Sequence, residues 1–302
     1  MTTLVTGGGG FLGSFLVERL QKRGDEVVVA RRRDYDLTRW DDTERLFAEV
    51  QPELVFHLAA EVGGIGANRA NPGRYWFANL MMGAHVLELS RLHGVSKLVL
   101  AGTVCAYPKF TQTPFSETEL WNGYPEETNA PYGVAKKSLL VGGQAYREQY
   151  GLDTVYLLPA NLYGPRDNFD LDTSHVVPAL IRKMLAGGSE VVLWGDGSPT
   201  REFLYVEDAA DAFVLASERD PGPEPINVGT GAEISIRQLA ELIAELTGYT
   251  GTIVWDSSMP NGQPRRRLDT SRAARVLGFE AGTPLREGLG RTIEWFRTSG
   301  QA

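Results

Sequence analysis

The stretch that decides the fold is Leu4-Val5-Thr6-Gly7-Gly8-Gly9-Gly10-Phe11-Leu12-Gly13. A short apolar run enters four glycines, and the segment that follows repeats its apolar residues at helical spacing as far as Leu20. A strand, a tight turn and a helix are therefore expected in that order. Gly24 is expected to end the helix, because glycine readily adopts the left-handed conformation that closes helices. The β-branched run Glu26–Ala30 then completes a βαβ unit.

The same alternation of short apolar runs and amphipathic segments continues through the first half of the chain. This pattern predicts parallel strands joined by crossover helices. The expected strands are Leu4–Thr6, Glu26–Ala30, Leu54–Leu58, Leu98–Ala101 and Thr154–Leu158. We therefore predict an α/β fold in which a doubly wound parallel Rossmann sheet carries a smaller α/β C-terminal lobe that binds the substrate.

The composition excludes several classes of protein. The formal net charge of -8 comes from 38 acidic and 30 basic residues, which disfavours binding to nucleic acid or to an anionic membrane. A single cysteine, Cys105, excludes an intrachain disulfide framework and a thiolate metal cluster, so no metal is expected. No apolar stretch approaches transmembrane length, and the first strand-like run leaves no room for a signal peptide. We therefore expect a cytoplasmic protein.

The spacing of Gly7, Gly10 and Gly13 is typical of a loop that holds a dinucleotide. Gly7 permits the tight turn, Gly10 lets the backbone approach a pyrophosphate, and Gly13 allows the helix to pack closely on the strand. The N–H groups and partial positive charge of the helix N-terminus then attract the phosphates. A plain flexible turn is the alternative, but the position between a strand and a helix favours dinucleotide binding.

The residues after the second strand distinguish NAD from NADP. An acidic residue there binds the ribose hydroxyls of NAD, whereas a basic residue accepts the 2'-phosphate of NADP. Arg31, Arg32 and Arg33 follow the strand directly, so NADP(H) is the expected cofactor. Asp34 is close enough to act as the acid, which leaves NAD as the less favoured alternative.

The alternating pattern ends after Leu158, where prolines, glycines and a polar run follow. Segment 203–217 and the strand-like Ile226–Val228 are expected to return to the sheet. Helices are expected at 177–186, 235–247 and 285–297. The dinucleotide-binding domain is accordingly predicted to comprise residues 1–160 and 203–229. Residues 161–202 and 230–302 are predicted to form the smaller, substrate-binding lobe.

A phenol and an ammonium, those of Tyr132 and Lys136, lie four residues apart on one face of an expected helix that runs from Pro131 towards Tyr150. The nearby ammonium is expected to lower the pKa of the phenol, so that it exchanges a proton with a carbonyl or alcohol oxygen. Thr103 follows a strand and offers its hydroxyl to the same oxygen. An ordinary helix surface is the alternative for an isolated pair, but the glycine loop favours catalysis.

With these residues the chain resembles the extended short-chain dehydrogenase/reductase family over nearly its whole length. Five further segments resemble the GDP-L-fucose synthase family, whose members use NADPH. These segments are His57–Ile65, Cys105–Lys109, Asn161–Pro165 with Asp167–Phe169, Ser174–Leu180 and Asn261–Arg265. The resemblance implies an oxidoreductase and isomerase that epimerises a nucleotide-linked 4-keto-6-deoxy sugar at C3 and C5 and then reduces C4.

The resemblance implies that Cys105 and His175 exchange the protons at C3 and C5. A ketone at C4 acidifies both neighbouring carbons, a thiolate is a competent base, and an imidazole acts as an acid near neutral pH. Cys105 lies two residues after Thr103, so an extended segment would turn both side chains to one cleft. Thr103, Tyr132 and Lys136 would serve the reduction. His57, His85 and His93 are interpreted as structural.

The resemblance also implies the binding residues. Those for the cofactor are Gly7, Gly10, Phe11, Leu12, Gly13, Arg31, Arg32, Asp36, Leu37, Leu58, Ala59, Ala60, Tyr132, Lys136, Pro159, Asn161, Leu162 and His175. Those for the substrate are Asn161, Lys183, Trp194, Arg201, Asn261, Arg265 and Arg266. Trp194 would flank the nucleotide base, and the arginines would neutralise the diphosphate. A surface ion pair from Arg201 to Glu202 or Glu207 is the alternative for that arginine.

The implied partners are a nucleotide sugar, with a GDP-sugar favoured, and a second copy of the chain in a homodimer. Two other functions stay open. The first is a redox-neutral epimerase or dehydratase of the same family, which returns its hydride to the substrate. The second is a cofactor-sensing regulatory protein, since a fold alone does not establish catalysis. Departures from the family include Thr103 and Val104, which stand where it usually has serines.

Overall fold

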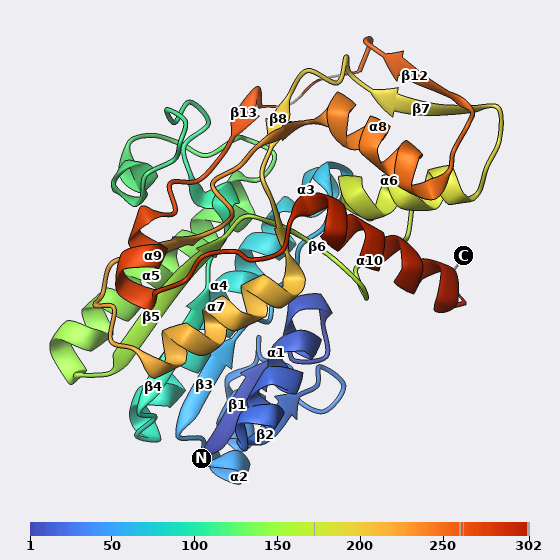
Figure 1. Cartoon of the computed structure of the whole chain (residues 1–302). Helices are drawn as coiled ribbons and strands as arrows, with labels where there is room; N and C mark the ends of the chain where they lie inside the picture. The colour runs from blue at the N-terminus through green and yellow to red at the C-terminus, as the bar shows by residue number, and fades with distance from the viewer. Residues whose placement is uncertain (172, 260, 262, 301–302) are drawn as a thin grey trace.

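The strand, turn and helix predicted at the N-terminus form as β1 (Thr2–Thr6) and α1 (Phe11–Arg23) in the computed structural model. The structure describes residues 1–300 apart from 172, 260 and 262. Gly24 ends α1 as predicted, with a left-handed φ of 95° and a backbone N–H that bonds the last carbonyls of the helix. The same strand-and-helix alternation then builds the larger part of the molecule (Figure 1).

Six parallel strands form the central sheet. Their order is β10-β5-β4-β3-β1-β2, and the sequence order reverses between β1 and β3. The bounds are Glu26–Ala30 for β2, Leu54–His57 for β3, Lys97–Ala101 for β4, Asp153–Pro159 for β5 and Ile226–Val228 for β10. The predicted doubly wound parallel sheet is confirmed, and all five predicted strands form within two residues of their expected ends.

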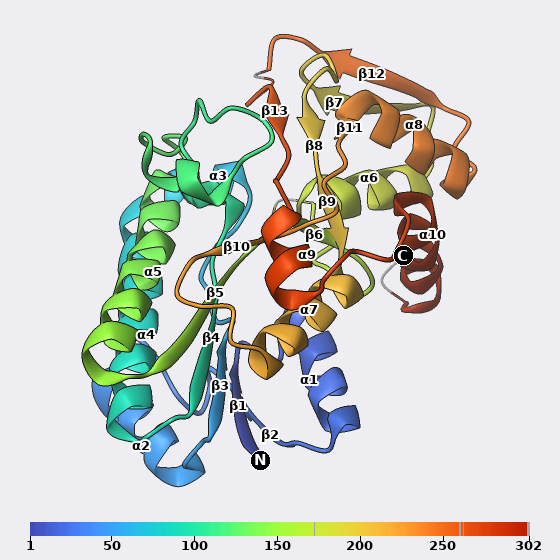
Figure 2. The same ribbon diagram turned by 60° about the vertical axis from the view of Figure 1, so that its left-hand side comes forward.

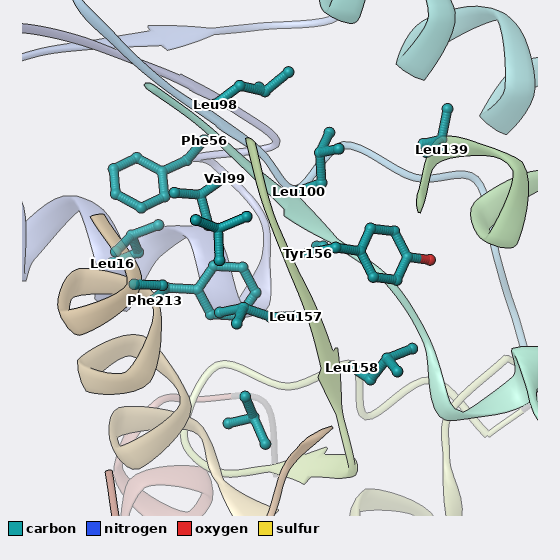
Figure 3. Packing of buried hydrophobic residues seen from close by; sticks show 14 of the residues in the cluster. Leu16, Phe56, Leu98, Val99, Leu100, Leu139, Tyr156, Leu157, Leu158 and Phe213 are labelled. Carbon is teal, nitrogen blue, oxygen red and sulfur yellow. The ribbon is translucent and has the colours of Figure 1, made fainter. Parts of the chain in front are cut away.

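Helices cover both faces of this sheet, as Figure 2 shows. Helix α1 packs with α7 (Val206–Glu218) on one face, and α2 (Trp40–Val50), α4 (Pro72–Leu92) and α5 (Ala130–Tyr150) cover the other. The strands are almost wholly apolar because both faces are buried. Figure 3 shows this core, in which Leu16 and Phe213 from the first pair of helices meet Leu157 of β5.

The smaller lobe lies beyond the carboxyl ends of the strands and has its own apolar cluster. It contains α6 (Val176–Leu185), α8 (Ile236–Thr247), α10 (Leu285–Thr298), β7 (Glu190–Trp194) and β12 (Thr252–Asp256). Helix α8 begins at a capping box, in which Ser235 and Gln238 exchange side-chain and backbone hydrogen bonds. The three helices predicted at 177–186, 235–247 and 285–297 therefore form, each within one residue of its expected ends.

Short strands connect the two parts of the molecule. Two of them, β6 (Asn161–Tyr163) and β9 (Phe203–Tyr205), pair in parallel, and β8 (Thr200–Arg201) lies between β11 (Ile234–Ser235) and β13 (Arg265–Arg266). The remaining elements are α3 (Ile65–Ala70), α9 (Ser271–Leu277) and two 3-10 turns, Val104–Ala106 and Glu117–Trp121.

Segment 203–217 was expected to return to the central sheet. This expectation is wrong for its strand, β9. β9 pairs with β6 outside the six-stranded sheet, because the chain has already left the sheet at Ala160; only α7 packs back onto it, and β10 supplies the sixth strand. The predicted domain boundaries at 160/161 and 202/203 stay a prediction. The paired strands β6 and β9 start directly after those boundaries.

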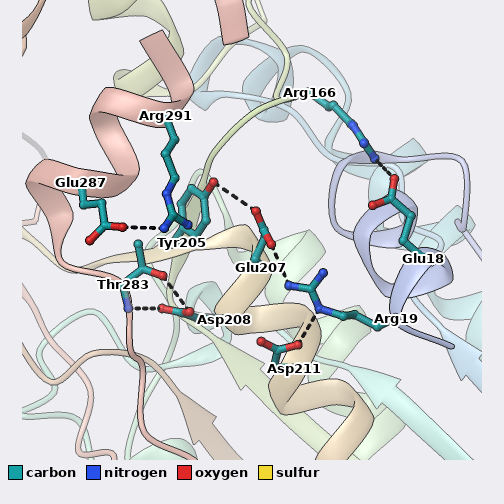
Figure 4. A network of polar contacts seen from close by, with 10 residues as sticks. All are labelled: Glu18, Arg19, Arg166, Tyr205, Glu207, Asp208, Asp211, Thr283, Glu287 and Arg291. Carbon is teal, nitrogen blue, oxygen red and sulfur yellow. Dashed lines mark hydrogen bonds and ion pairs between the residues drawn. The ribbon is translucent and has the colours of Figure 1, made fainter. Parts of the chain in front are cut away.

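A polar network holds the lobe and the helices together, as Figure 4 shows. Arg19 of α1 donates to Glu207 and Asp211 of α7 at 2.7 Å each. Asp208 of α7 accepts the backbone N–H and the hydroxyl of Thr283 at 2.9 Å. These bonds fix the segment that leads into α10. No helix in the described part of the chain is long and apolar enough to cross a membrane.

Candidate active site

The turn between β1 and α1 needs glycine at two positions. Gly7 has a left-handed φ of 73°, and a Cβ there would lie 2.7 Å from the backbone nitrogen of Ala59. A Cβ at Gly13 would lie 2.1 Å from the carbonyl oxygen of Gly7. Gly10 stands at the N-cap of α1 and offers no side chain to its N–H groups. The turn therefore brings bare backbone to a helix N-terminus, which fits the pyrophosphate of a dinucleotide.

Three arginines follow β2, and their surroundings differ. The guanidinium of Arg31 lies over the glycine turn, 3.2 Å from the position of a Cβ on Gly9. Arg32 pairs with Glu61 at 3.0 Å, and Arg33 pairs with Asp34 at 3.4 Å. In the described part of the chain Arg31 has no carboxylate partner. It is thus the arginine best placed for a 2'-phosphate.

Asp36 holds the loop that follows. Its carboxylate accepts the N–H of Thr38 at 3.0 Å and the hydroxyl of the same residue at 2.7 Å. These hydrogen bonds lower the pKa of Asp36. The next residue, Leu37, is buried, and its carbonyl oxygen bonds the ring of His85 at 3.0 Å. Both residues therefore fix the loop beside the predicted adenosine end of the cofactor site.

The remaining predicted cofactor residues lie where parallel strands end. Leu58, Ala59 and Ala60 follow β3, Pro159 ends β5, Asn161 and Leu162 lie in β6, and Phe11 and Leu12 start α1. The side-chain amide of Asn161 donates to the carbonyl oxygen of Glu202 at 2.8 Å. Ligands of doubly wound sheets bind in the crevice at the carboxyl ends of the strands, where the strand order reverses. In this sheet the order reverses between β1 and β3. Their assignment to the cofactor stays a prediction.

Tyr132 and Lys136 lie on α5, and Thr103 follows β4; the three side chains are 8%, 1% and 8% exposed. Gly133 allows the close approach that brings them together, since a Cβ there would lie 2.5 Å from the carbonyl oxygen of Cys105. Helix α5 therefore lies directly against the turn that carries Thr103. The predicted Thr, Tyr and Lys residues thus come together at the carboxyl edge of the sheet.

The expected effect of the ammonium on the phenol is wrong. Burial raises the pKa of Tyr132, the nearby Cys105 raises it further, and a hydrogen bond with Thr103 opposes both. Burial lowers the pKa of Lys136 to about 8. Desolvation is the largest cause of both shifts, because both side chains are buried. Tyr132 is therefore a protonated phenol, the form that donates a proton.

Cys105 does not lie in an extended segment, as expected, but in the 3-10 turn Val104–Ala106. Its backbone N–H donates to the Thr103 hydroxyl oxygen at 3.2 Å, which caps the turn. The turn buries Val104 and Ala106 and leaves Cys105 half-buried. The guanidinium of Arg266 lies 3.9 Å from that sulfur. A thiolate formed at Cys105 would therefore be next to a positive charge.

His175 is the N-cap residue of α6. The loop before it passes Gly64, where a Cβ would lie 3.7 Å from the carbonyl oxygen of Ser174. The residue is exposed at the surface, and desolvation by the protein around the ring lowers the pKa of His175. No contact among the described residues joins His175 to Cys105. Its role as the acid partner stays a prediction.

Arg201 and Arg266 lie side by side on the paired strands β8 and β13. Burial, and then the charge of Arg266, lower the pKa of Arg201 to about 10. The alternative ion pair with Glu202 or Glu207 does not form, because Glu202 accepts backbone N–H groups and Glu207 pairs with Arg19. Among the described residues no carboxylate pairs with Arg201. Two adjacent guanidinium groups are thus available for an anion.

Arg201 also lines a pocket of about 280 Å³ between β8, the 230–234 loop and the 281–285 segment. Other predicted substrate residues lie farther out. Arg265 pairs with Glu233, Trp194 is 64% exposed on β7, and Lys183 donates to the carbonyl oxygen of Val192 at 3.4 Å. Asn261 accepts the backbone N–H of Asp196 at 2.9 Å. These residues belong to the outer lobe, and their substrate contacts stay a prediction.

Sequence reasoning missed the residues that hold the start of α5. Glu126 accepts the backbone N–H and the side-chain amide of Asn129, at 3.3 and 2.7 Å. Asn129 in turn accepts the amide of Asn68 at 2.7 Å. The signal was present, because an asparagine before Ala130-Pro131 is typical of a helix N-terminus. This network fixes the turn of helix that carries Tyr132.

A glycine turn at a helix N-terminus, together with a buried threonine, tyrosine and lysine at the same sheet edge, defines a nicotinamide-dependent enzyme of the short-chain dehydrogenase/reductase class. In the described residues no group of three or more His, Cys, Asp or Glu side chains could hold a metal ion. The family model described as "NAD dependent epimerase/dehydratase family" matches residues 3–229.

Relatives and solved structures extend this match to nearly the whole chain. GDP-L-fucose synthase 1 from Arabidopsis thaliana is 42% identical over 297 residues, which cover 97% of this chain and 92% of that protein. A GDP-L-fucose synthetase from Naegleria fowleri bound to NADP superposes with a TM-score of 0.92 at 30% identity, covering 99% and 93% of the two chains. A UDP-glucose 4-epimerase from Thermotoga maritima superposes with a TM-score of 0.90 at 33% identity, covering 99% of both.

The chain belongs to the NAD dependent epimerase/dehydratase family, in the branch of the GDP-L-fucose synthases. The family resemblance and the enzyme class expected from the sequence are thereby confirmed.

Proposed function

We propose that this protein uses NADPH to epimerise a GDP-linked 4-keto-6-deoxy sugar at C3 and C5 and to reduce it at C4. Relatives of that name, about two fifths identical over nearly the full length, support the activity. The expected cofactor NADP(H) is confirmed by the similar solved structure that binds NADP. The observation that carries the proposal is the meeting of Cys105 and Arg266 with the buried Thr103, Tyr132 and Lys136.

The glycine turn and Arg31 fit the dinucleotide, and when bound NADPH supplies the hydride for C4. Tyr132 then donates its proton to the C4 oxygen. Its raised pKa keeps the phenol protonated until that oxygen becomes an alkoxide, a far stronger base than a ketone. Thr103 donates a hydrogen bond to the same oxygen and polarises it. Lys136 keeps a positive charge near the reacting oxygen, where negative charge develops.

The epimerisations need a base and an acid on opposite faces of the sugar. The C4 ketone acidifies the protons on C3 and C5, and the Cys105 thiolate removes one of them. Arg266 donates a hydrogen bond to the sulfur at 3.9 Å, which places a positive charge beside it. His175 gives a proton to the other face and then takes a new proton from water, while the Cys105 thiol releases its proton to water. The lobe residues Arg201 and Arg266 hold the diphosphate, since guanidinium groups suit phosphate oxygens.

The test separates the proton transfers from the hydride transfer. Cys105→Ser should abolish deuterium uptake at C3 and C5 from heavy water, because a serine hydroxyl is too weakly acidic to give a base. It should retain some reduction at C4, measured as the loss of absorbance of the reduced nicotinamide when NADPH is oxidised. Uptake at the wild-type rate would remove Cys105 from the reaction. Conversion of the sugar without net NADPH oxidation would instead favour a redox-neutral epimerase.

We further infer a homodimer in the cytoplasm. Large apolar side chains on the outer surfaces of α4 and α5 support a dimer, because Trp76, Phe77 and Val141 are 45%, 51% and 48% exposed. Two helices that present such a surface on one side of the sheet fit the same surface of a second copy. Sedimentation at micromolar concentration should give twice the chain mass of 33.2 kDa. A monomer under those conditions would contradict the inference.

A further inference from the structure

Two side chains at β13 bond the segment that carries Cys105. Gln263 lies three residues before Arg266, and its amide donates to the carbonyl oxygen of Lys109 at 2.8 Å. Arg266 reaches the other end of the segment, where its Nη1 lies 3.9 Å from the sulfur of Cys105. The ammonium of Lys109 is turned to another partner, because it pairs with Glu127 at 2.8 Å.

The orientation of the Gln263 amide is fixed by its partners. A carbonyl oxygen only accepts hydrogen bonds, so the amide nitrogen must face Lys109. A guanidinium only donates, so the amide oxygen must face Arg266. That oxygen accepts from Nε of Arg266 at 3.3 Å and from Nη2 at 3.0 Å. These two bonds leave Nη1 to face the sulfur of Cys105.

The backbone around Gln263 is held by strand pairing. The N–H of Thr200 donates to the carbonyl oxygen of Pro264 at 2.9 Å, and that of Glu202 donates to the carbonyl oxygen of Arg266 at 3.1 Å. These bonds pair β13 with β8. The strand therefore sets where the guanidinium of Arg266 starts, and the amide of Gln263 sets where it points.

The two arginines of β13 have partners of different charge. Arg265 pairs with the carboxylate of Glu233, which offsets its charge. Arg266 is bonded by the neutral amide of Gln263, and no carboxylate of the described residues pairs with it. An amide oxygen orients a guanidinium through the same two hydrogen bonds as a carboxylate would, but it leaves the full positive charge in place.

The groups that face Cys105 come from two elements. Helix α5 packs against the Cys105 backbone at Gly133 and carries Tyr132, whose pKa is raised by the nearby Cys105. Strand β13 contributes Arg266, and Arg201 lies beside Arg266 on β8. Tyr132 brings no positive charge. Among the described residues, Arg266 is therefore the cation that contacts the sulfur.

We propose that Gln263 is a positioning residue, whose neutral amide holds Arg266 against Cys105 without offsetting the charge of the guanidinium. A thiolate formed at Cys105 then lies next to a full positive charge. The inference rests on the proposed function, because it takes this thiolate as the base of the epimerisations. It assigns to Gln263 an effect on the sulfur that passes through Arg266.

The first experiment measures the alkylation of Cys105 by iodoacetamide as a function of pH, since the thiolate is the form that reacts. Cys105 is the only cysteine of the chain, so the added thioether reports this residue alone by mass spectrometry. Gln263→Met keeps the length of the side chain but loses both strong hydrogen bonds. Gln263→Glu keeps an acceptor for Arg266 but offsets its charge.

The pH of half-maximal alkylation should rise by about half a unit in Gln263→Met and by about one unit in Gln263→Glu. A glutamine that only ties two segments together would change the access of the reagent to the sulfur, and hence the maximal rate, but would leave this pH unmoved. Gln144→Met and Gln144→Glu are matched controls, because the Gln144 amide also donates to a backbone carbonyl, that of Pro223, and bonds no arginine. Both controls should match wild type.

A double-mutant cycle shows whether Gln263 acts through Arg266. Arg266→Met should raise the pH of half-maximal alkylation by about one unit, and adding Gln263→Met should raise it no further. Additive shifts in the double variant would overturn the proposal. A profile of Gln263→Glu that equals that of wild type would overturn it as well.

The second experiment measures deuterium uptake at C3 and C5 of the GDP-linked 4-keto-6-deoxy sugar. Uptake at pH 7 should fall about tenfold in Gln263→Glu and recover when the pH is raised by about one unit. Undiminished uptake in this variant would overturn the link between Gln263 and the epimerisations. If the wild-type protein takes up no deuterium, the proposed function fails, while the alkylation profiles still decide the role of Gln263.

Discussion

Two buried charged side chains differ in the partners that the protein gives them. Lys136 on α5 and Glu202 between β8 and β9 are each 1% exposed. The carboxylate of Glu202 is surrounded by hydrogen-bond donors. The backbone N–H groups of Thr230, Gly231 and Leu268 lie 2.6 to 2.8 Å from its two oxygens. Around Lys136 there is no carboxylate in the described part of the chain, and burial lowers its pKa to about 8.

The difference teaches which buried charge serves the fold and which serves the chemistry. Glu202 binds two segments of backbone, 230–231 and the one at Leu268, at the junction with the outer lobe. Burial raises the pKa of Glu202, and these hydrogen bonds oppose the rise. The surroundings of Lys136 provide no such compensation in the free protein. A site that keeps an uncompensated cation is less stable than it could be, and active sites often accept that loss. Three variants test this contrast.

Tyr132→Phe should give the largest effect, on the catalytic side of the contrast. It removes the proton donor, so kcat should fall about a thousandfold, which is about 4 kcal/mol of activation free energy. Steady-state NADPH oxidation measures the change, and thermal unfolding should show a protein at least as stable as wild type. Tyr156→Phe is the matched control, because Tyr156 is another buried tyrosine and lies on the neighbouring strand β5. Retention of a tenth of the activity in Tyr132→Phe would contradict its role.

Glu202→Ala tests the structural side. Three backbone N–H groups would lose their acceptor, and the expected loss is about 3 kcal/mol in the free energy of unfolding, measured in urea. The control is Glu245→Ala, which removes one side of the exposed bidentate pair with Arg286 and should leave stability at the wild-type value. Equal midpoints for both variants would show that Glu202 does not hold the junction.

Lys136→Met should stabilise the protein while it abolishes reduction. Its folded pKa of about 8 lies below the usual value of 10.5 for lysine, so the unfolded chain binds more protons between these values. Wild-type stability from this group should therefore rise as pH increases from about 8 to 10 and be smallest below 8. The variant lacks this rise, and at pH 7 it should be about 2 kcal/mol more stable than wild type. Parallel stability curves across this pH range would contradict the assignment.

Local patterns were enough to predict the sheet. Strands buried on both faces are short apolar runs, and the glycine turn between β1 and α1 cannot form with other residues at Gly7 and Gly13. Strand β9 was assigned to the central sheet because a run of three apolar residues does not show which strand it pairs with. In the structure it pairs with β6. Pairing between short strands depends on the tertiary structure.

The residues of the candidate site were predicted from residue types and from their spacing in the sequence. The structure adds the contacts between residues that are far apart in the sequence. The sequence could not show that Arg266 reaches Cys105, since 161 positions separate them. It also gave the wrong direction for the pKa of Tyr132, because desolvation depends on burial by distant segments. His57 was interpreted as structural, and the structure buries it between β1 and β4.

The outer lobe has its own apolar cluster, and this gives the enzyme a modular character. Trp194 and Lys183 lie on β7 and α6, two elements of that second cluster. On the predicted assignment, exchange of these two residues would alter the nucleoside preference while Thr103, Tyr132 and Lys136 stay in place. Exchange of this lobe between two enzymes of the family is the direct test of that assignment.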